Sequence, residues 1–310
     1  MTRSTLLKKA KSIKSLTLLI ATVMIGICFS GEMSEYILDG MDLAARSVIP
    51  SSFPFMIISD FYIYYGSPEQ LGILGNLLCK LIGIEPYMLG AFICGNIGGF
   101  PIGAKMAADL YSDINTDKYE LERLIPLSSN PSAAFVIGGV GLGMYNDIKI
   151  GSILLASIFS SMIWCAVLTK KKHSKNHFTA HIHKQNYSFV LSTRQAGASC
   201  IGLVSFICIF SAIVGLIKNH MKNDVISYSL ITFLEVTNAV KIFSDSNLIP
   251  LPISVGLSGF ALGFGGLSVM MQSAALLSGS DLGIKKYFFI KLLQGLLCSA
   301  ISAILYLLII

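Results

Sequence analysis

The stretch 92-FICGNIGGFPIGAKMAADLY-111 combines an apolar approach, a cluster of glycines with one proline, and a resumed helical pattern that carries Lys105 and Asp109. Glycine and proline interrupt a helix and leave backbone N–H and C=O groups without intrahelical partners. In an apolar protein such a break is tolerated only where it faces other protein or a water-filled cavity. The stretch therefore predicts a broken membrane helix.

A second stretch, 259-GFALGFGGLSVMMQSAALL-277, repeats this design later in the chain. Aligning Gly98-Gly99 with Gly265-Gly266 places Lys105 level with Gln272. Paired glycine-interrupted segments in two halves of a chain indicate a transporter site at the membrane midplane, because half-helix N-termini offer free N–H groups to an anion. The alternative is that the glycines only permit tight helix packing. The alignment of two such segments favours the binding site.

The composition is that of a membrane protein. Of 310 residues, 54% are hydrophobic and 13% are charged, whereas a soluble domain carries about 25% charged residues. We expect an all-α polytopic membrane protein with about ten transmembrane or re-entrant helices. Most of the net charge of +6 comes from basic clusters beside spans, which indicates topology signals rather than nucleic-acid binding.

The charge pattern divides the chain into four parts. Residues 1–45 hold a basic, cytoplasmic N-terminus and a first helix at about 15–30, which we expect to stay uncleaved because no small-x-small site follows it. We expect residues 46–169 to form a first repeat with one extra span, and residues 194–310 to form a second. A basic cytoplasmic loop at 170–193 joins them. The parity of membrane crossings predicts an inverted repeat with one Gly-broken helix in each half.

The expected segments carry several further signals. An acidic segment at 32–42 is predicted on the outer side, opposite the cytoplasmic N-terminus, and Pro50 and Pro54 predict a kinked or broken helix. In the first half we expect elements at 46–65, 70–84, 86–110 (broken) and 119–145; in the second half, at 195–218, 225–242, 249–278 (broken) and 287–310.

Ionisable residues inside apolar segments are functional candidates. Lys105 follows the first break by six residues and is expected either to bind a solute, to pair with a carboxylate, or to snorkel toward the membrane edge. Glu235 is expected to carry a proton or to pair with Lys105; its alternative role is to cap a broken backbone element. Asn130-Pro131 marks another break, whose neighbouring serines line a polar cavity or repair the backbone.

Other patterns exclude function classes. His173, His177, His181 and His183 lie among lysines in the basic loop, which favours a solvated tether over a metal site. The seven cysteines show no C-x-x-C spacing, and residues 98–105 lack the Gly-Lys-Ser/Thr of a phosphate loop. Without a visible Ser/His/Asp or Cys/His set, we expect no enzymatic activity, no cofactor and no bound metal.

Five motifs follow one another along the chain: 49-IPSSFPFMIISDFYIYYG-66, 98-GGFPIGAKMAADL-110, 129-SNPSAAFVIGGVGLGMY-145, 234-LEVTNA-239 and 259-GFALGFGGLSV-269. Together they resemble the YlbJ-type sporulation integral membrane proteins, within the larger group that carries the nucleoside-recognition, or Gate, domain. The resemblance implies a membrane role in spore maturation and movement of dipicolinate, a flat dianion. By position it marks Gly98, Gly99, Pro101, Gly103, Lys105, Asn130, Pro131, Glu235, Thr237, Gly265, Gly266 and Ser268.

We therefore expect a multi-pass protein of the cytoplasmic or forespore membrane that moves a small, anionic solute, coupled to a proton or sodium ion. The alternative is a non-transporting scaffold or receptor of the Gate-domain type. Lipid is the other expected partner, and nucleic acid is not. The expected solute-binding residues are Asn96, Gly98, Gly99, Pro101, Gly103, Lys105, Ser129, Asn130, Glu235, Thr237, Asn238, Gly265, Gly266, Ser268 and Gln272.

Overall fold

The computed structural model describes residues 23–24, 26–65, 72–113, 117–170 and 188–310, and these residues form helices without any β-strand. The all-α prediction is confirmed. By length and composition, four helical segments of the described chain can cross a membrane: α8 (Ile148–Leu168), α9 (Phe189–His220), the Leu251–Leu276 segment and α14 (Lys285–Ile309). A fifth span forms if α4 (Gly72–Ile82) and the Pro86–Gly98 segment, bent by 97°, are counted together. The described residues thus contain four or five apolar spans, and the expected total of about ten transmembrane or re-entrant helices stays a prediction.

The first half begins with one continuous helical run. α2 (Ser30–Leu43) passes through a π-helical turn, η1 (Ala44–Val48), into α3 (Ile49–Tyr65). The acidic segment predicted as an outer connection is therefore helical. The prolines also do not break the run, since Pro50 lies just after the π-helical turn η1 and within the continuous helix. Pro54 is accommodated inside α3.

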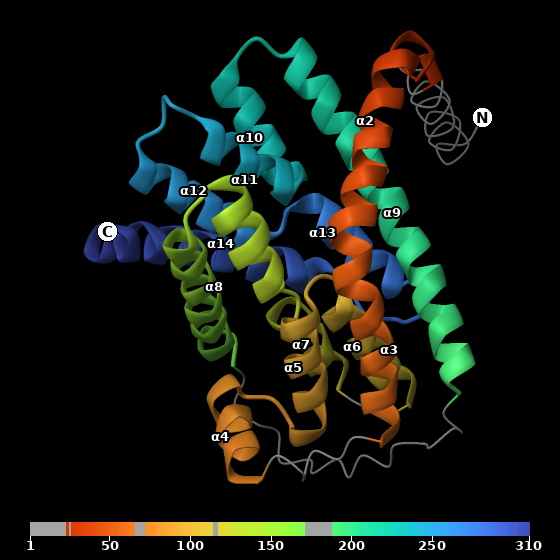
Figure 1. Ribbon diagram of the computed structural model, residues 1–310. Helices are drawn as coiled ribbons and strands as arrows, with labels where there is room; N and C mark the ends of the chain where they lie inside the picture. The colour runs from red at the N-terminus through yellow and green to blue at the C-terminus, as the bar shows by residue number, and fades with distance from the viewer. Residues whose placement is uncertain (1–22, 25, 66–71, 114–116, 171–187) are drawn as a thin grey trace, which may run out of the picture.

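α2 packs lengthwise on α9, as Figure 1 shows at the right of the molecule. Glycines permit the close approach: a Cβ on Gly215 would lie 2.1 Å from the ring of Tyr36, and one on Gly40 would lie 2.9 Å from the Ser211 hydroxyl. Two expected domain boundaries, after residues 45 and 193, fall inside η1 and α9. The first predicted helix, at 15–30, and the histidine loop lie largely outside the described residues.

Four helical elements are interrupted near their middle. Both glycine breaks occur where they were predicted, and two further interruptions follow Leu127 and Leu234. The prediction of a single helix at 225–242 is wrong, because Glu235 adopts an extended backbone (φ −149°, ψ 124°). The four pairs are α5 (Leu89–Gly98) with α6 (Ile102–Asp113), α7 (Lys118–Leu127) with the π-helix η4 (Phe135–Met144), α10 (Asp224–Leu234) with α11 (Val236–Asp245), and α12 (Leu251–Phe264) with α13 (Gly266–Leu276).

The backbone at the glycine breaks explains the residue types. Gly99 has φ +83°, and the Phe100–Pro101 peptide bond is cis. Gly265 and Gly266 have φ +84° and +78°. These left-handed values are open to glycine and strained for other residues. The sequence therefore ends α5 and α12 at these points, whatever packs around them.

α14 runs crosswise to α9 in Figure 1 and packs along α12 and α8. Apolar side chains form two clusters in the described chain, one around α5, α6 and α7 and the other around η4, α8, α11 and α12. The interrupted elements lie between these two clusters. Their breaks are thereby brought to the centre of the molecule, where they form the site described below.

Candidate functional site

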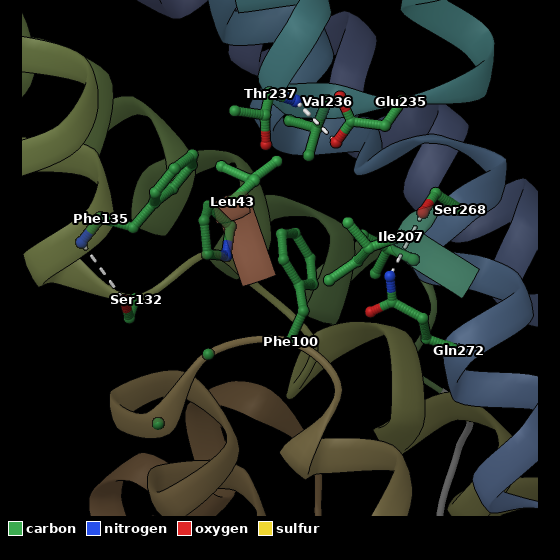
Figure 2. Close-up of a pocket in the computed structure, with 14 residues that line it drawn as sticks. Leu43, Phe100, Ser132, Phe135, Ile207, Glu235, Val236, Thr237, Ser268 and Gln272 are labelled. Atoms are coloured by element: carbon green, nitrogen blue, oxygen red, sulfur yellow. Dashed lines mark hydrogen bonds between the residues drawn. The ribbon is translucent and has the colours of Figure 1, made fainter. Parts of the chain in front are cut away.

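A pocket of about 90 Å³ lies where the breaks meet. Each of the four interrupted elements contributes to its wall, although Gly98 and Gln272 stand 174 positions apart in the sequence. Figure 2 shows the Phe100 ring projecting among these walls from the turn between α5 and α6. The lining consists of Leu43, Gly98, Gly99, Phe100, Pro131, Ser132, Phe135, Ile207, Glu235, Val236, Thr237, Ser268, Val269 and Gln272.

The pocket gathers six of the residues that the sequence nominated for solute binding: Gly98, Gly99, Glu235, Thr237, Ser268 and Gln272. The other nominated residues do not line it: Asn96, Pro101, Gly103, Lys105, Ser129, Asn130, Asn238, Gly265 and Gly266. Solute binding by any of these residues stays a prediction. Phe100, Ser132 and Phe135 line the pocket without having been nominated.

Glu235 is 7% exposed and caps the N-terminus of α11. Its carboxylate accepts hydrogen bonds from the backbone N–H groups of Thr237 (3.0 Å) and Asn238 (2.7 Å), and from the Asn238 amide (3.0 Å). A negative charge at a helix N-terminus is stabilised by the helix dipole. This geometry matches the alternative role of Glu235, which is to cap a broken backbone element. Glu235 does not pair with Lys105.

Gln272 and Ser268 lie one turn apart on α13 and face the pocket together. The Gln272 amide donates a hydrogen bond to the Ser268 hydroxyl at 3.2 Å, and both residues are buried. Figure 2 shows this pair on the opposite wall from Ser132 and Phe135. The pocket thus combines hydrogen-bonding groups with aromatic rings, a combination typical of small-molecule sites.

Lys105 lies outside the pocket, in a buried charge cluster. Its ammonium pairs with Asp60 of α3 and, at 3.0 Å, with Asp109 one turn along α6. The second oxygen of Asp60 accepts a hydrogen bond from Ser192 of α9 at 2.6 Å. Of the three expected roles of Lys105, the structure shows pairing with carboxylates. The cluster joins α3, α6 and α9.

Asn130 is completely buried in the break that follows α7. Its amide donates to the side-chain oxygen of Asn96 (2.8 Å) and to the Leu127 carbonyl (3.1 Å). Its own oxygen accepts hydrogen bonds from Lys291 (3.0 Å) and Gln294 (2.7 Å) of α14. Asn130 therefore repairs the broken backbone and also connects α5 to α14.

Sequence reasoning missed Lys291 and Gln294. The signal was present, since Lys291 is an ionisable residue inside the apolar run 287-YFFIKLLQGLLC-298. The criterion that singled out Glu235 applies equally to it. Its acceptors could not be identified from sequence, because Ser129 and Asn130 lie more than 160 residues earlier.

The two halves of the first broken element approach each other through glycines. A Cβ on Gly95 or Gly103 would lie 2.4 Å from the Ser128 carbonyl oxygen. α5, α6 and the end of α7 therefore meet backbone to backbone. Gly103, nominated as a binding residue, is explained here by close packing.

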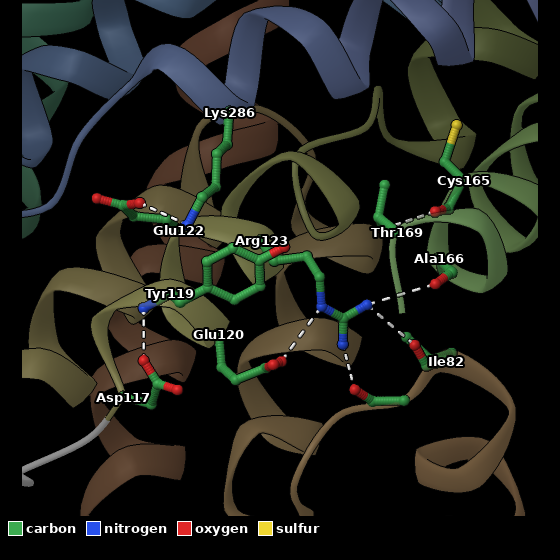
Figure 3. Close-up of polar contacts among 11 residues, drawn as sticks. Ile82, Asp117, Tyr119, Glu120, Glu122, Arg123, Cys165, Ala166, Thr169 and Lys286 are labelled. Atoms are coloured by element: carbon green, nitrogen blue, oxygen red, sulfur yellow. Dashed lines mark hydrogen bonds and ion pairs between the residues drawn. The ribbon is translucent and has the colours of Figure 1, made fainter. Parts of the chain in front are cut away.

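A polar cluster fastens α7 to its neighbours, as Figure 3 shows. Arg123 is 1% exposed, bonds to Glu120, and donates to the carbonyl oxygens of Ile82, Gly83 and Ala166. These contacts neutralise the C-terminal carbonyls of α4 and α8. Within the described chain, no group of three histidine, cysteine or carboxylate side chains is placed to hold a metal ion.

Glu122, on the same helix, fixes the start of α14. Its carboxylate lies 2.8 Å from the Lys286 ammonium and accepts the Gly283 N–H at 2.8 Å. Burial raises the pKa of Glu122, but these two partners outweigh burial and hold the pKa below its usual 4.5. The Lys286 ammonium also lies 3.4 Å from the centre of the Tyr119 ring.

Comparison with known proteins gives one informative relative. No family model matches the chain, and no solved structure matches it. The chain is 26% identical over 320 residues to the sporulation integral membrane protein YlbJ of Bacillus subtilis (strain 168), covering 86% of this chain and 76% of the relative. Together with the apolar helices, this similarity supports an integral membrane protein and the assignment of this chain to the YlbJ-type sporulation integral membrane proteins.

Proposed function

We propose that this chain is a membrane transporter or facilitator of a small solute that acts during sporulation. The observation that carries the proposal is the central pocket at which the breaks of four helical elements meet. Broken helices supply unpaired backbone groups at the centre of a transporter, where a substrate exchanges its hydration shell for protein contacts. The sporulation setting is taken from the Bacillus subtilis relative, a sporulation integral membrane protein.

The pocket favours a flat solute with hydrogen-bonding groups. Phe100 and Phe135 offer ring faces, and Ser268, Thr237 and Gln272 offer polar contacts. A volume of about 90 Å³ accommodates a few water molecules.

A second pocket, of about 240 Å³, supports an anionic solute. It shares Leu43 and Thr237 with the central pocket and contains Lys218 and Lys241. Asp39 also lines it, and Lys218 binds the Asn238 side-chain oxygen at 2.9 Å. Two lysines at the approach to a site raise the local concentration of anions. We therefore retain a dipicolinate-like anion as the first solute to test.

The order of the helical elements fits an alternating-access transporter. It also pairs the breaks of the two halves differently from the sequence alignment of the two glycine stretches. Apart from α4, which has no counterpart in this matching, the first half contains α3, α5/α6, α7/η4 and α8; the second contains α9, α10/α11, α12/α13 and α14. Matching by order pairs the Gly99 break with Glu235 and the Asn130 break with Gly265. We propose an inverted repeat with this pairing, in a multi-pass protein whose N-terminus is cytoplasmic.

The test is uptake into proteoliposomes of labelled dipicolinate and, separately, a nucleoside, with and without pH and sodium gradients. Gln272→Leu removes a polar group from the pocket wall, and we expect at least a tenfold loss of uptake with normal expression. Ser205→Ala is the matched control, because Ser205 bonds only within α9 and does not line the pocket. Normal uptake by Gln272→Leu would place the solute elsewhere.

The second candidate is a non-transporting scaffold or receptor. This candidate is favoured because a charge of the protein itself, the Glu235 carboxylate, already occupies the N-terminus of α11 at one of the breaks. If intact protein moves neither dipicolinate, nucleosides nor a wider panel of organic anions, this candidate replaces the transporter. Binding of a solute without uptake would support a receptor.

A further inference from the structure

Lys291 is fully buried, and within the described residues it forms no ion pair with a carboxylate. Its ammonium donates to three uncharged oxygen atoms: the Ser129 carbonyl (2.9 Å), Asn130 Oδ1 (3.0 Å) and Gln294 Oε1 (2.8 Å). A buried cation is costly unless its hydrogen-bonding groups are satisfied. These three oxygens therefore form a site for a positive charge.

The neighbouring amides fix the direction of every hydrogen bond in this site. Asn96 Nδ2 donates to the carbonyls of Phe92 (2.8 Å) and Leu127 (3.2 Å), which leaves its oxygen to accept from Asn130 Nδ2. The Asn130 oxygen must then face Lys291 and Gln294. An ammonium has three donors and a neutral amine only two, so three acceptors match the protonated lysine.

The site lies at the C-terminal end of α7, where unpaired carbonyls carry a partial negative charge. Unwound carbonyls at the ends of half-helices are the groups with which transporters coordinate a coupling cation. The Lys291 nitrogen lies 5.7 Å from the centre of the Phe100 ring, which lines the central pocket. The fixed cation therefore lies directly behind the pocket wall.

We infer that the Lys291 ammonium occupies the place of a coupling sodium ion, so that a built-in charge holds the break between α7 and η4. The coupling role of this site rests on the proposed transport function, whereas the cation site itself is a property of the folded chain. All three donors of Lys291 are used within the protein, so none is left for a bound anion. Solute binding should consequently be independent of sodium.

Removing the side chain should expose the site to sodium. Lys291→Ala leaves the three oxygens beside an opened space, whereas Lys291→Met fills that space with an apolar chain. Ser129, whose carbonyl accepts from Lys291, also has a buried hydroxyl that forms no hydrogen bond of normal geometry in the described chain. A small cation entering the Ala variant would meet oxygens on several sides.

The experiment measures the thermal unfolding midpoint of purified protein in sodium chloride and in choline chloride of equal ionic strength. Wild type should have the same midpoint in both. Lys291→Ala should lose at least about 5 °C in choline and recover more than half of it saturably with sodium. Lys291→Met should be destabilised without recovery. Lys285→Ala is the matched control, because Lys285 is exposed on the same helix.

Two results would overturn the inference. Equal midpoints of Lys291→Ala in the two salts would show that the lysine is only structural, and a sodium-dependent midpoint of wild type would reveal a separate sodium site. If Lys291→Ala aggregates, its monodisperse yield after extraction in each salt replaces the midpoint, and equal yields overturn the inference. Unfolding needs no solute, so failure of transport leaves the outcome unaffected.

Discussion

The Lys291 ammonium of α14 lies 3.0 Å from the side-chain oxygen of Asn130, which stands 161 residues earlier in the break after α7. Glu235 occupies the N-terminal end of another half-helix in the same way, with its carboxylate on the first N–H groups of α11. A positive side chain thus meets a helix C-terminus and a negative one meets an N-terminus. Each charge is opposite in sign to the partial charge of the helix end that it meets. Both arrangements therefore stabilise backbone groups that a membrane could not solvate.

The contact between α6 and α7 depends on glycine at position 103. Gly103→Ala places a methyl group 2.4 Å from the Ser128 carbonyl oxygen, so the helices must separate. We expect the free energy of unfolding to fall by about 1–3 kcal/mol. Gly202→Ala, on α9, adds a methyl group with no atom within 4 Å and should be neutral or stabilising by up to about 1 kcal/mol. Denaturant unfolding of both variants checks this, and equal stabilities would contradict it.

The buried charge cluster should behave as a coupled unit. Lys105→Met leaves the Asp60 carboxylate, 14% exposed, with the Ser192 hydroxyl as its remaining hydrogen-bond partner among the described residues. An uncompensated buried charge costs about 3–5 kcal/mol. The double variant Lys105→Met/Asp60→Leu should recover at least half of that loss in a double-mutant cycle.

Lys241→Met is the control for this cluster, because Lys241 and Asp245 form an exposed pair. Exposed pairs contribute about 0–1 kcal/mol. If the Lys105 and Lys241 variants lose the same stability, the buried cluster does not hold α3, α6 and α9 together.

Glu235 variants separate capping from proton transfer. Glu235→Ala removes the cap of α11 and should lower the free energy of unfolding by about 1–2 kcal/mol. Glu235→Gln retains one accepting oxygen and should lose about half as much. Uptake by the Gln variant decides the chemistry: normal uptake assigns Glu235 to the backbone, and loss of uptake with stability kept assigns it a proton. An Ala variant as stable as wild type would contradict the capping role.

Acid should weaken the attachment of α7 to α14 through Glu122. The pKa of this carboxyl is held below 4.5 in the folded protein by Lys286 and Gly283, after its burial has acted in the opposite direction. The ionised form therefore stabilises the fold fully above the unfolded pKa, and this contribution is lost as pH falls through the folded pKa. The stability difference between wild type and Glu122→Gln should persist from pH 7 to about 5 and shrink below pH 4. A difference that is constant with pH would rule out this linkage.

The sequence by itself determined the helical class and both glycine breaks. Apolar composition excludes a soluble fold, and left-handed backbone at Gly99 and Gly265 follows from a local property of glycine. It also nominated Gly98, Glu235, Gln272 and other residues of the pocket wall, because polar groups and backbone breaks in apolar segments are conspicuous. Local chemistry was sufficient for each of these predictions.

Only the tertiary structure decided which groups meet. Lys105 pairs with Asp60 and Asp109 rather than Glu235, and Lys291 bonds to Asn130, 161 residues earlier in the chain. These choices depend on how long helices pack, and no sequence spacing encodes a distance between residues separated by many turns and breaks. The sequence therefore supplied the breaks and the charges, and packing assigned each charge to a helix end or to another charge.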